Sequence, residues 1–138
     1  MQTRDLFPLV LCGLIGACAG APSGAKPSEP ADGSATVIRG SEFSGTVLEG
    51  LRTRYPAARI STEGSVCPRI MFRGQRSLQF QGNPGVYVDG TLMSDTCVLT
   101  QITSLDVDFI EVYPSGITSR ATVQRNPFGL ILVFRRKE

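Results

Sequence analysis

The side chains that could carry chemistry in this 138-residue sequence are four cysteines and 12 carboxylates, with no histidine among them. The missing histidine removes imidazole general bases, Ser-His-Asp triads, Cys-His dyads and histidine-ligated metals together. No nucleophile motif stands out among the other residues. The sequence therefore predicts a protein that is not an enzyme and that holds neither a cofactor nor a metal ion.

The first 17 residues have the form of an export signal. An apolar run over 6–17 follows Arg4 and is too short to span about 30 Å of hydrocarbon as a helix. It ends in Ile15–Cys18, which resembles the lipobox, where bacterial lipoprotein signal peptides are cut before a lipidated cysteine. We expect Cys18 to carry more than one acyl chain, which anchors a protein stably. The alternative is an ordinary signal peptide with a chance cysteine.

Residues 18–35 predict a flexible tether. They are rich in Ala, Gly, Pro and Ser and cannot bury enough apolar surface to fold. Such a tether holds the following domain, residues 36–138, roughly 20–25 Å from the bilayer. Ala19, where an aspartate would signal retention, favours the outer membrane by resemblance to Gram-negative sorting rules. We therefore expect a lipid-anchored protein on the periplasmic face of the outer membrane, with the inner membrane left open.

Two cysteines, Cys67 and Cys97, remain after export. In an oxidising periplasm the default for such a pair is a disulfide. Closing the loop between them would stabilise the fold by roughly 3.6 kcal/mol in the chain-entropy model. A redox or metal role is the sharper alternative, but there is no Cys-x-x-Cys motif, and two thiols without histidine do not make a zinc site.

The charged residues have plain interpretations. Asp89-Gly90 predicts a tight turn, because aspartate tolerates turn geometry and glycine supplies a positive φ. Asp106 and Asp108 could form a carboxylate pair, but we interpret them as a solvated approach to a strand. Arg135–Lys137 is a solvated tail, or else a contact with anionic lipid or another chain. A net charge of +2 does not indicate a nucleic-acid partner.

The elements that position these residues alternate between strand and helix patterns. Apolar residues that share one helical stripe predict a helix over 43–55, capped by Ser41 or Ser44 and ended by Pro56. Asp95 could cap a second short helix that carries Val98, Leu99 and Ile102. Short strands are expected over 36–38, 59–61, 68–72, 85–88, 109–113 and 129–135. The last of these is apolar on both faces, which predicts a central or doubly covered strand. Alternation places Ile70 and Phe72 on one face of their strand and Arg69, Met71 and Arg73 on the other, and it points Ile110 and Val112 inward. The fold class is therefore α+β, a small mixed β-sheet domain with two short helices.

The domain resembles the plug domain of TonB-dependent outer-membrane receptors over roughly 40–136. The matching stretches occur in family order. They are Phe72–Gly74 with Ser77–Leu78, Val86–Gly90, Ile102 with Asp108–Tyr113 and Gly116, and Gly129–Val133. The resemblance implies a plug-like fold in which the following residues form the structural motif: Arg73, Gly74, Asp89, Gly90, Glu111 and Gly129. It also suggests that Arg73 forms a buried ion pair with Asp89 or Glu111.

The sequence departs from the family in three places. The segment 117–128 lacks the usual Tyr-Gly-x-x-Ala-x-Gly, and Thr36–Ile38 is a poor TonB box. The chain also stops where a receptor would begin its barrel, and 138 residues cannot hold a 22-strand pore. We therefore expect a stand-alone plug without a barrel, in which the fold carries over and the transport function does not follow automatically.

Three function classes remain. The first is a lipid-anchored interaction module that contacts another envelope protein, such as an outer-membrane barrel, and is associated with TonB-dependent transport. Its expected contact surface is the loop 74–84, around Arg76, Leu78 and Phe80, although this loop could equally pack on its own domain. The second class is a stand-alone periplasmic small-ligand binder. The third, an enzyme, is disfavoured by the absence of histidine.

Overall fold

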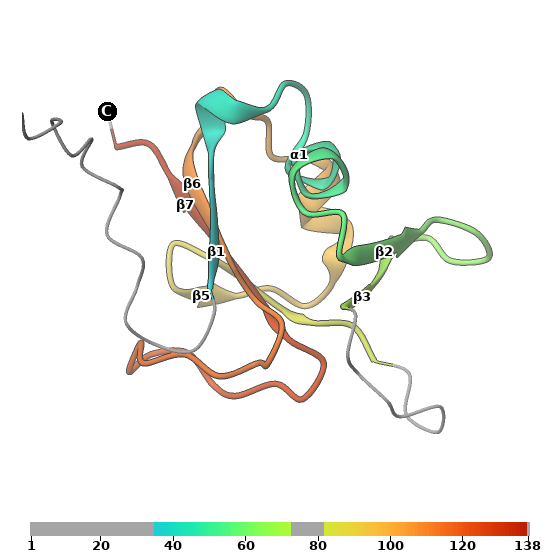
Figure 1. Cartoon of the computed structure of the whole chain (residues 1–138), viewed down its shortest axis with the longest axis vertical. Coiled ribbons are helices and arrows are strands. Elements are labelled where there is room, and N and C mark those ends of the chain that lie inside the picture. The colour runs from blue at the N-terminus through green and yellow to red at the C-terminus, as the bar shows by residue number, and fades with distance from the viewer. Residues whose placement is uncertain (1–34, 73–81, 138) are drawn as a thin grey trace, which may run out of the picture.

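The part of the chain that the structure describes forms one five-stranded sheet, a separate two-stranded hairpin, one α-helix and two 3-10 turns (Figure 1). A computed structural model describes residues 35–72 and 82–137. In chain order the elements are β1 (Thr36–Arg39), η1 (Gly40–Glu42), α1 (Val47–Arg54), β2 (Ala58–Ser61), β3 (Arg69–Phe72), β4 (Gly85–Val88), β5 (Thr91–Leu92), η2 (Thr96–Thr100), β6 (Val107–Tyr113) and β7 (Leu130–Arg135). The predicted mixed α+β class is confirmed. Among the described helices, none has the length and apolar character needed to cross a bilayer.

The five-stranded sheet has β7 at its centre. The strand order is β1-β6-β7-β4-β5, and every neighbouring pair is antiparallel except β7 with β4. Residues Leu130–Val133 of β7 are all buried, so neither face of this strand meets water. The sequence predicted this doubly covered strand, because its apolar residues do not alternate with polar ones.

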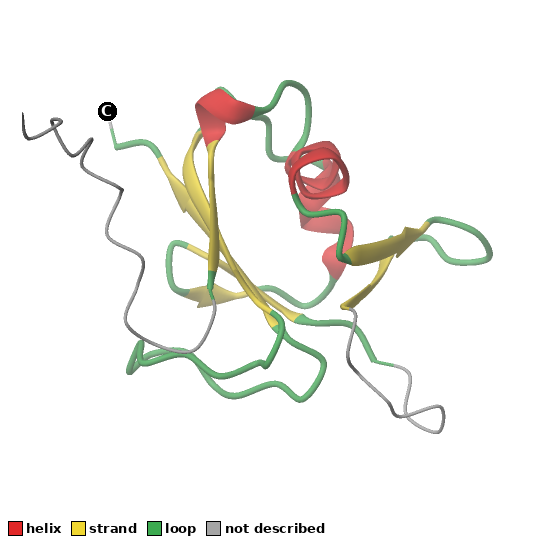
Figure 2. Ribbon diagram, in the orientation of Figure 1, coloured by secondary structure: helices red, strands yellow, loops and turns green. Residues whose placement is uncertain are grey.

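The two faces of the sheet are covered by different parts of the chain. On one face, α1 and η2 pack over the sheet (Figure 2), and the core there includes Ile38, Leu51, Ile110 and Val133. On the other face, Tyr87, Tyr113, Leu130 and Leu132 form a second apolar cluster, against which Val123 packs. The long connection between β6 and β7 therefore covers sheet surface that no helix reaches.

Helix α1 is shorter than the sequence predicted and begins at a different cap. Thr46 is the N-cap, its hydroxyl accepts from the backbone N–H of Glu49, and the Glu49 carboxylate accepts from the N–H of Thr46. This reciprocal pair is a capping box, so the predicted caps Ser41 and Ser44 are wrong. The predicted end is confirmed, since the helix stops at Arg54, just before Pro56.

Phe43 lies outside α1 but still packs against it. Its ring sits so close to Gly50 that a Cβ at Gly50 would meet the ring at 2.6 Å. Gly50 weakens the helix intrinsically, and the structure shows what that position provides instead: space for an aromatic ring. The stripe that predicted a helix from Phe43 therefore identified the right buried side chains and the wrong starting residue.

The hairpin of β2 and β3 is joined to the main domain by a disulfide. Ile70 and Phe72 of β3 are buried while Arg69 and Met71 are exposed, as the alternation predicted. Cys67, just before β3, is bonded to Cys97 in η2, with the two Cα atoms 4.6 Å apart. The predicted Cys67–Cys97 disulfide is present, and it connects the hairpin to the 3-10 turn that packs on the sheet.

Candidate functional site

Several residues that the sequence singled out lie outside the described part of the chain. They are the expected lipidation site Cys18, the motif residues Arg73 and Gly74, and the expected contact surface of Arg76, Leu78 and Phe80. These predictions remain predictions. The described motif residues Asp89, Gly90, Glu111 and Gly129 all lie on the sheet or in its turns.

Asp89 and Gly90 form the predicted tight turn, between β4 and β5. Both have positive φ, 49° and 85°, as a two-residue hairpin turn of the primed type requires. The Asp89 carboxylate also accepts two hydrogen bonds from Arg135, one from its backbone N–H at 2.9 Å and one from its Nε at 2.6 Å. The hydrogen bond from the Arg135 backbone has the larger effect and the one from its side chain the next, and both lower the pKa of Asp89 below its ordinary value. Asp89 therefore connects the end of β7 to the β4–β5 hairpin through these hydrogen bonds.

Glu111 is a buried carboxylate on the face of the sheet opposite α1. The Arg120 guanidinium donates two hydrogen bonds to this carboxylate, from Nε to Oε2 at 2.8 Å and from Nη2 to Oε1 at 2.6 Å. The hydroxyl of Tyr113 donates to the same carboxylate at 2.9 Å. The hydrogen bonds to Glu111 raise the pKa of Arg120 above its already high value, so the guanidinium stays charged. A buried charge is tolerated when it is paired and hydrogen-bonded in this way.

Arg120 is the residue that sequence reasoning missed. It lies in the segment 117–128 that departs from the plug pattern, and its guanidinium also stacks 4.6 Å from the ring centre of Phe134. The signal available was indirect. A strand that turns Ile110 and Val112 into one core must turn Glu111 onto the opposite face, where it needs a cation. The structure shows Arg120 as the partner of Glu111 and Arg135 as the partner of Asp89, whereas the proposed partner Arg73 is not described.

Gly129 has a steric role at the start of β7. Its φ is 97°, and a Cβ there would lie 2.4 Å from the ring of Phe72. Any larger residue would therefore be strained and would push the β2–β3 hairpin away from the sheet. The motif glycine is explained by packing rather than by ligand binding.

Cys67, Cys97 and Asp95 lie close enough together to suggest a metal site, but the cysteine sulfur atoms cannot bind a metal as thiolates. The two sulfur atoms and a carboxylate oxygen lie within 4.8 Å of one another. The sulfurs are bonded to each other, so they offer no thiolate ligands. Asp95 instead accepts from the backbone N–H of Cys97 at 2.9 Å and caps η2, as predicted.

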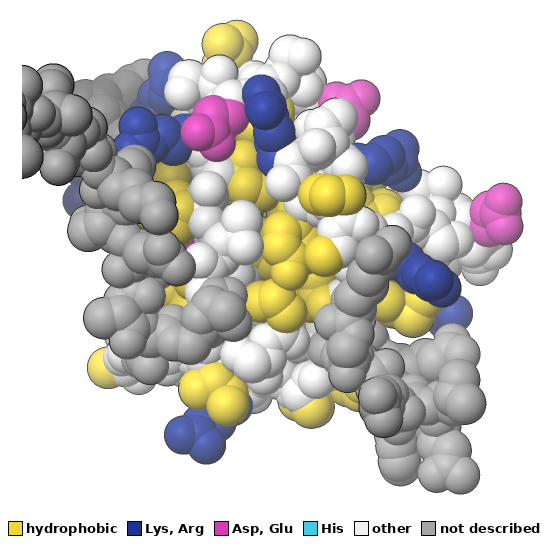
Figure 3. Space-filling view, in the orientation of Figure 1, with side chains coloured by type: hydrophobic (Ala, Val, Ile, Leu, Met, Phe, Trp, Pro, Cys, Tyr) yellow, Lys and Arg dark blue, Asp and Glu magenta, His cyan; other side chains and the backbone are white. Residues whose placement is uncertain are grey.

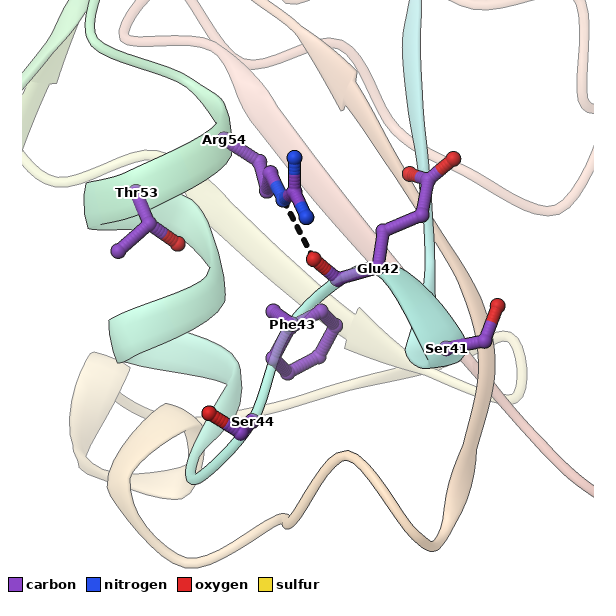
Figure 4. Close-up of a pocket in the computed structure, with 6 residues that line it drawn as sticks. All are labelled: Ser41, Glu42, Phe43, Ser44, Thr53 and Arg54. Atoms are coloured by element: carbon purple, nitrogen blue, oxygen red, sulfur yellow. Dashed lines mark hydrogen bonds between the residues drawn. The ribbon is translucent and has the colours of Figure 1, made fainter.

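The described residues line several hollows on the surface. The first, about 510 Å³, lies between η1 and the end of α1 (Figure 4). There Arg54 points toward the backbone carbonyl of Glu42 beside the ring of Phe43. A second, about 300 Å³, lies at β3 beside Arg69 and Met71. Another, about 1010 Å³, lies where the end of β7 meets the loop 101–106. Its lining combines the apolar Ile102 and Leu105 with several charged side chains.

Comparisons with known proteins give a fold and no family. No family model and no curated protein matches the sequence. Among solved structures, the chain is similar to one from the RagAB peptide importer in its "closed-closed" state, with a TM-score of 0.57 and 15% identity. The similarity covers 75% of this chain and only 12% of the other. The fold of this domain therefore recurs as a small part of a chain in an importer.

The Glu111–Arg120 pair should be needed for stability. Arg120→Ala leaves the buried carboxylate with only the Tyr113 hydroxyl. We expect a loss of about 1–3 kcal/mol in the free energy of unfolding, between the values for exposed and buried pairs, because the Arg120 side chain is 41% exposed. Urea unfolding measures this. Arg125→Ala, at an exposed arginine with no ion pair in the described chain, should change stability by less than about 0.5 kcal/mol. Equal losses for the two variants would contradict the assignment.

The Asp89–Arg135 pair should make stability depend on acid. A carboxyl whose folded pKa is lowered adds stability above its unfolded pKa of about 3.9 and loses it as the pH falls through the folded pKa. Asp89→Asn keeps a residue that tolerates the turn and removes this contribution. Unfolding measured from pH 7 to pH 2 should show a deficit for the variant that shrinks below about pH 4. Arg135→Gln removes the side-chain hydrogen bond and keeps the backbone N–H that donates to Asp89, so it should show a smaller deficit at pH 7. A deficit independent of pH for Asp89→Asn would refute the pairing.

Proposed function

We propose that this chain is a lipid-anchored, plug-like interaction module of the bacterial envelope, associated with transport across the outer membrane. The observation that carries the proposal is an agreement between two independent lines. The sequence stretches that resemble receptor plugs run in family order, and the fold recurs within a chain of a peptide importer. Import is the activity of that larger protein, of which this fold covers 12%. The role proposed here is contact with an envelope partner, not transport by this chain.

The anchor in this proposal is Cys18. Its support is the sequence alone: a short apolar run, small residues before the cysteine and a Pro/Gly/Ser/Ala tether after it. Two or more acyl chains on one residue hold a protein at a bilayer stably, whereas a single chain does not. An interaction module held in this way searches for its partner in two dimensions, which raises the effective concentration of both.

A small-ligand binder is the second candidate, and one observation favours it. The hollow of about 1010 Å³ at the end of β7 has the volume of a small-molecule site and combines apolar and charged groups. Unlike most such sites, it is lined by exposed side chains such as Leu105 rather than by buried ones. A surface of this kind fits an extended partner better than an enclosed ligand.

The anchor can be tested in cells with an alkyne-tagged fatty acid and matched serine variants. The wild type and Cys12→Ser should incorporate the label and fractionate with the outer membrane, because Cys12 lies inside the expected signal peptide. Cys18→Ser should incorporate none. Equal labelling of Cys18→Ser and the wild type, or an intact, unacylated N-terminus by mass spectrometry, would overturn the anchor.

The partner can be tested in the same cells by photo-crosslinking from exposed positions of the domain. Covalent capture of an outer-membrane barrel protein, lost when the domain is unfolded by a core substitution, is the expected result. A domain that crosslinks to no envelope protein and purifies as a monomer with a bound small molecule would overturn the interaction role and favour the second candidate.

A further inference from the structure

The end of the sheet opposite the point where the chain enters it has an unusual surface. It is formed by the loop 101–106 and the C-terminal residues 135–137, which we call the basic end. Figure 1 shows the C-terminus at one end of the sheet and the start of β1 at the other. The register agrees, because Thr36 lies opposite Val112 whereas Val107 lies opposite Arg135.

Hydrogen bonds to the rest of the domain hold the two arginines of the basic end in place. The backbone N–H of Arg136 donates to the carbonyl of Asp106 at 2.9 Å. The Nε of the same arginine donates to the carbonyl of Val107 at 3.1 Å. Arg135 is fixed by Asp89. Arg136 is therefore held against the end of the loop 101–106 and Arg135 against the β4–β5 turn, so the fold sets the positions of both arginines.

Some charged side chains of the basic end have an ion-pair partner within the domain, and others do not. Asp89 is paired with Arg135, and the Asp106 carboxylate accepts from the hydroxyl of Thr103 at 2.7 Å. Within the described residues, Arg136 and Lys137 form no ion pair. On the face drawn in Figure 3, lysine and arginine side chains lie along the upper part, at the right and at the bottom, with acidic side chains between those of the upper part. Arg136 and Lys137 outnumber the Asp106 carboxylate beside them, so the basic end keeps a net positive charge that can attract an anionic surface.

An apolar side chain lies beside these cations. Leu105 is 78% exposed and lines the hollow of about 1010 Å³ together with Arg136 and Lys137. An exposed leucine next to long basic side chains is the arrangement that enters a bilayer interface, with the leucine among acyl chains and the cations at the phosphates.

We propose that the basic end docks on the anionic surface of a lipid bilayer. A membrane fits this surface better than an acidic protein does. Protein interfaces are enriched in aromatic residues, and none of the strongly exposed apolar side chains of the described chain is aromatic. Lipid headgroups, by contrast, rearrange to match two cations and one leucine.

The docking is compatible with the anchor proposed above. Seventeen residues separate Cys18 from Thr36, a length that reaches at most about 56–61 Å when extended. The seven residues of β6 span only about 23 Å. A lipidated Cys18 can therefore share a bilayer with the basic end, although the chain enters the sheet at the other end.

The absence of tryptophan makes a direct test available. Leu105→Trp places a single reporter at the basic end. Ile117→Trp, at a residue 50% exposed in the loop at the opposite end, is the matched control. The full chain purified from membranes is mixed with neutral phosphatidylcholine vesicles or with vesicles containing phosphatidylglycerol. Flotation reports attachment, while emission and quenching by brominated lipid report docking.

In anionic vesicles, we expect the indole emission of Leu105→Trp to shift to shorter wavelength and to be quenched, whereas the indole of Ile117→Trp stays in water. Adding Arg136→Gln and Lys137→Gln to the Leu105→Trp chain should weaken docking by about fivefold per charge removed, and high salt should do the same.

The remaining outcomes separate docking from anchoring. A Leu105→Trp chain that floats with both vesicle types while its indole stays in water would overturn docking alone. Flotation with anionic vesicles only would support docking and overturn the anchor, and flotation with neither would overturn both. Binding of an acidic protein to the basic end, with no shift or quenching of the Leu105→Trp indole in either vesicle type, would also overturn docking.

Discussion

Burial of β7 on both faces is the constraint on which the rest of the structure depends. Four consecutive residues, Leu130–Val133, lie in the middle of the sheet with no contact with water. Such a strand is stable only if both faces of its sheet are covered. The chain meets this demand with α1 and η2 on one face and with the connection 114–129 on the other. The β2–β3 hairpin completes the first cover, and the disulfide joins it to η2.

The same constraint determines where the charged residues lie. Covering the second face buries Glu111, and the covering segment supplies Arg120 to neutralise it. At the end of β7, where the cover stops, Arg135 pairs with the turn aspartate Asp89. Beyond this point the chain has cations left over beside the exposed Leu105. The two ends of the sheet therefore differ: one is closed by the connection 114–129, and the other presents charge and an apolar side chain to its surroundings.

Much of this architecture could be predicted from local patterns. Alternation identified Ile70 and Phe72 of β3 and Ile110 and Val112 of β6 as buried. The continuous apolar run identified the central strand, and Asp89-Gly90 identified the hairpin. These features depend on neighbours in sequence. The start of α1 was missed because three candidate hydroxyls lie within a few residues, and only the capping box with Glu49 selects Thr46. Arg120 and Arg135 were not assigned because their partners lie 9 and 46 residues away across loops, and residue types alone do not reveal which cation reaches which carboxylate.

The role of β7 as the protected centre of a covered sheet can be measured by native-state amide hydrogen exchange. The backbone amides of Leu130–Val133 should exchange slowest, at the rate set by global unfolding, while the amides of the β2–β3 hairpin open sooner. Reduction of the Cys67–Cys97 disulfide should speed exchange in the hairpin more than in β7. Amides in β7 that exchange as fast as those of the hairpin would contradict the account.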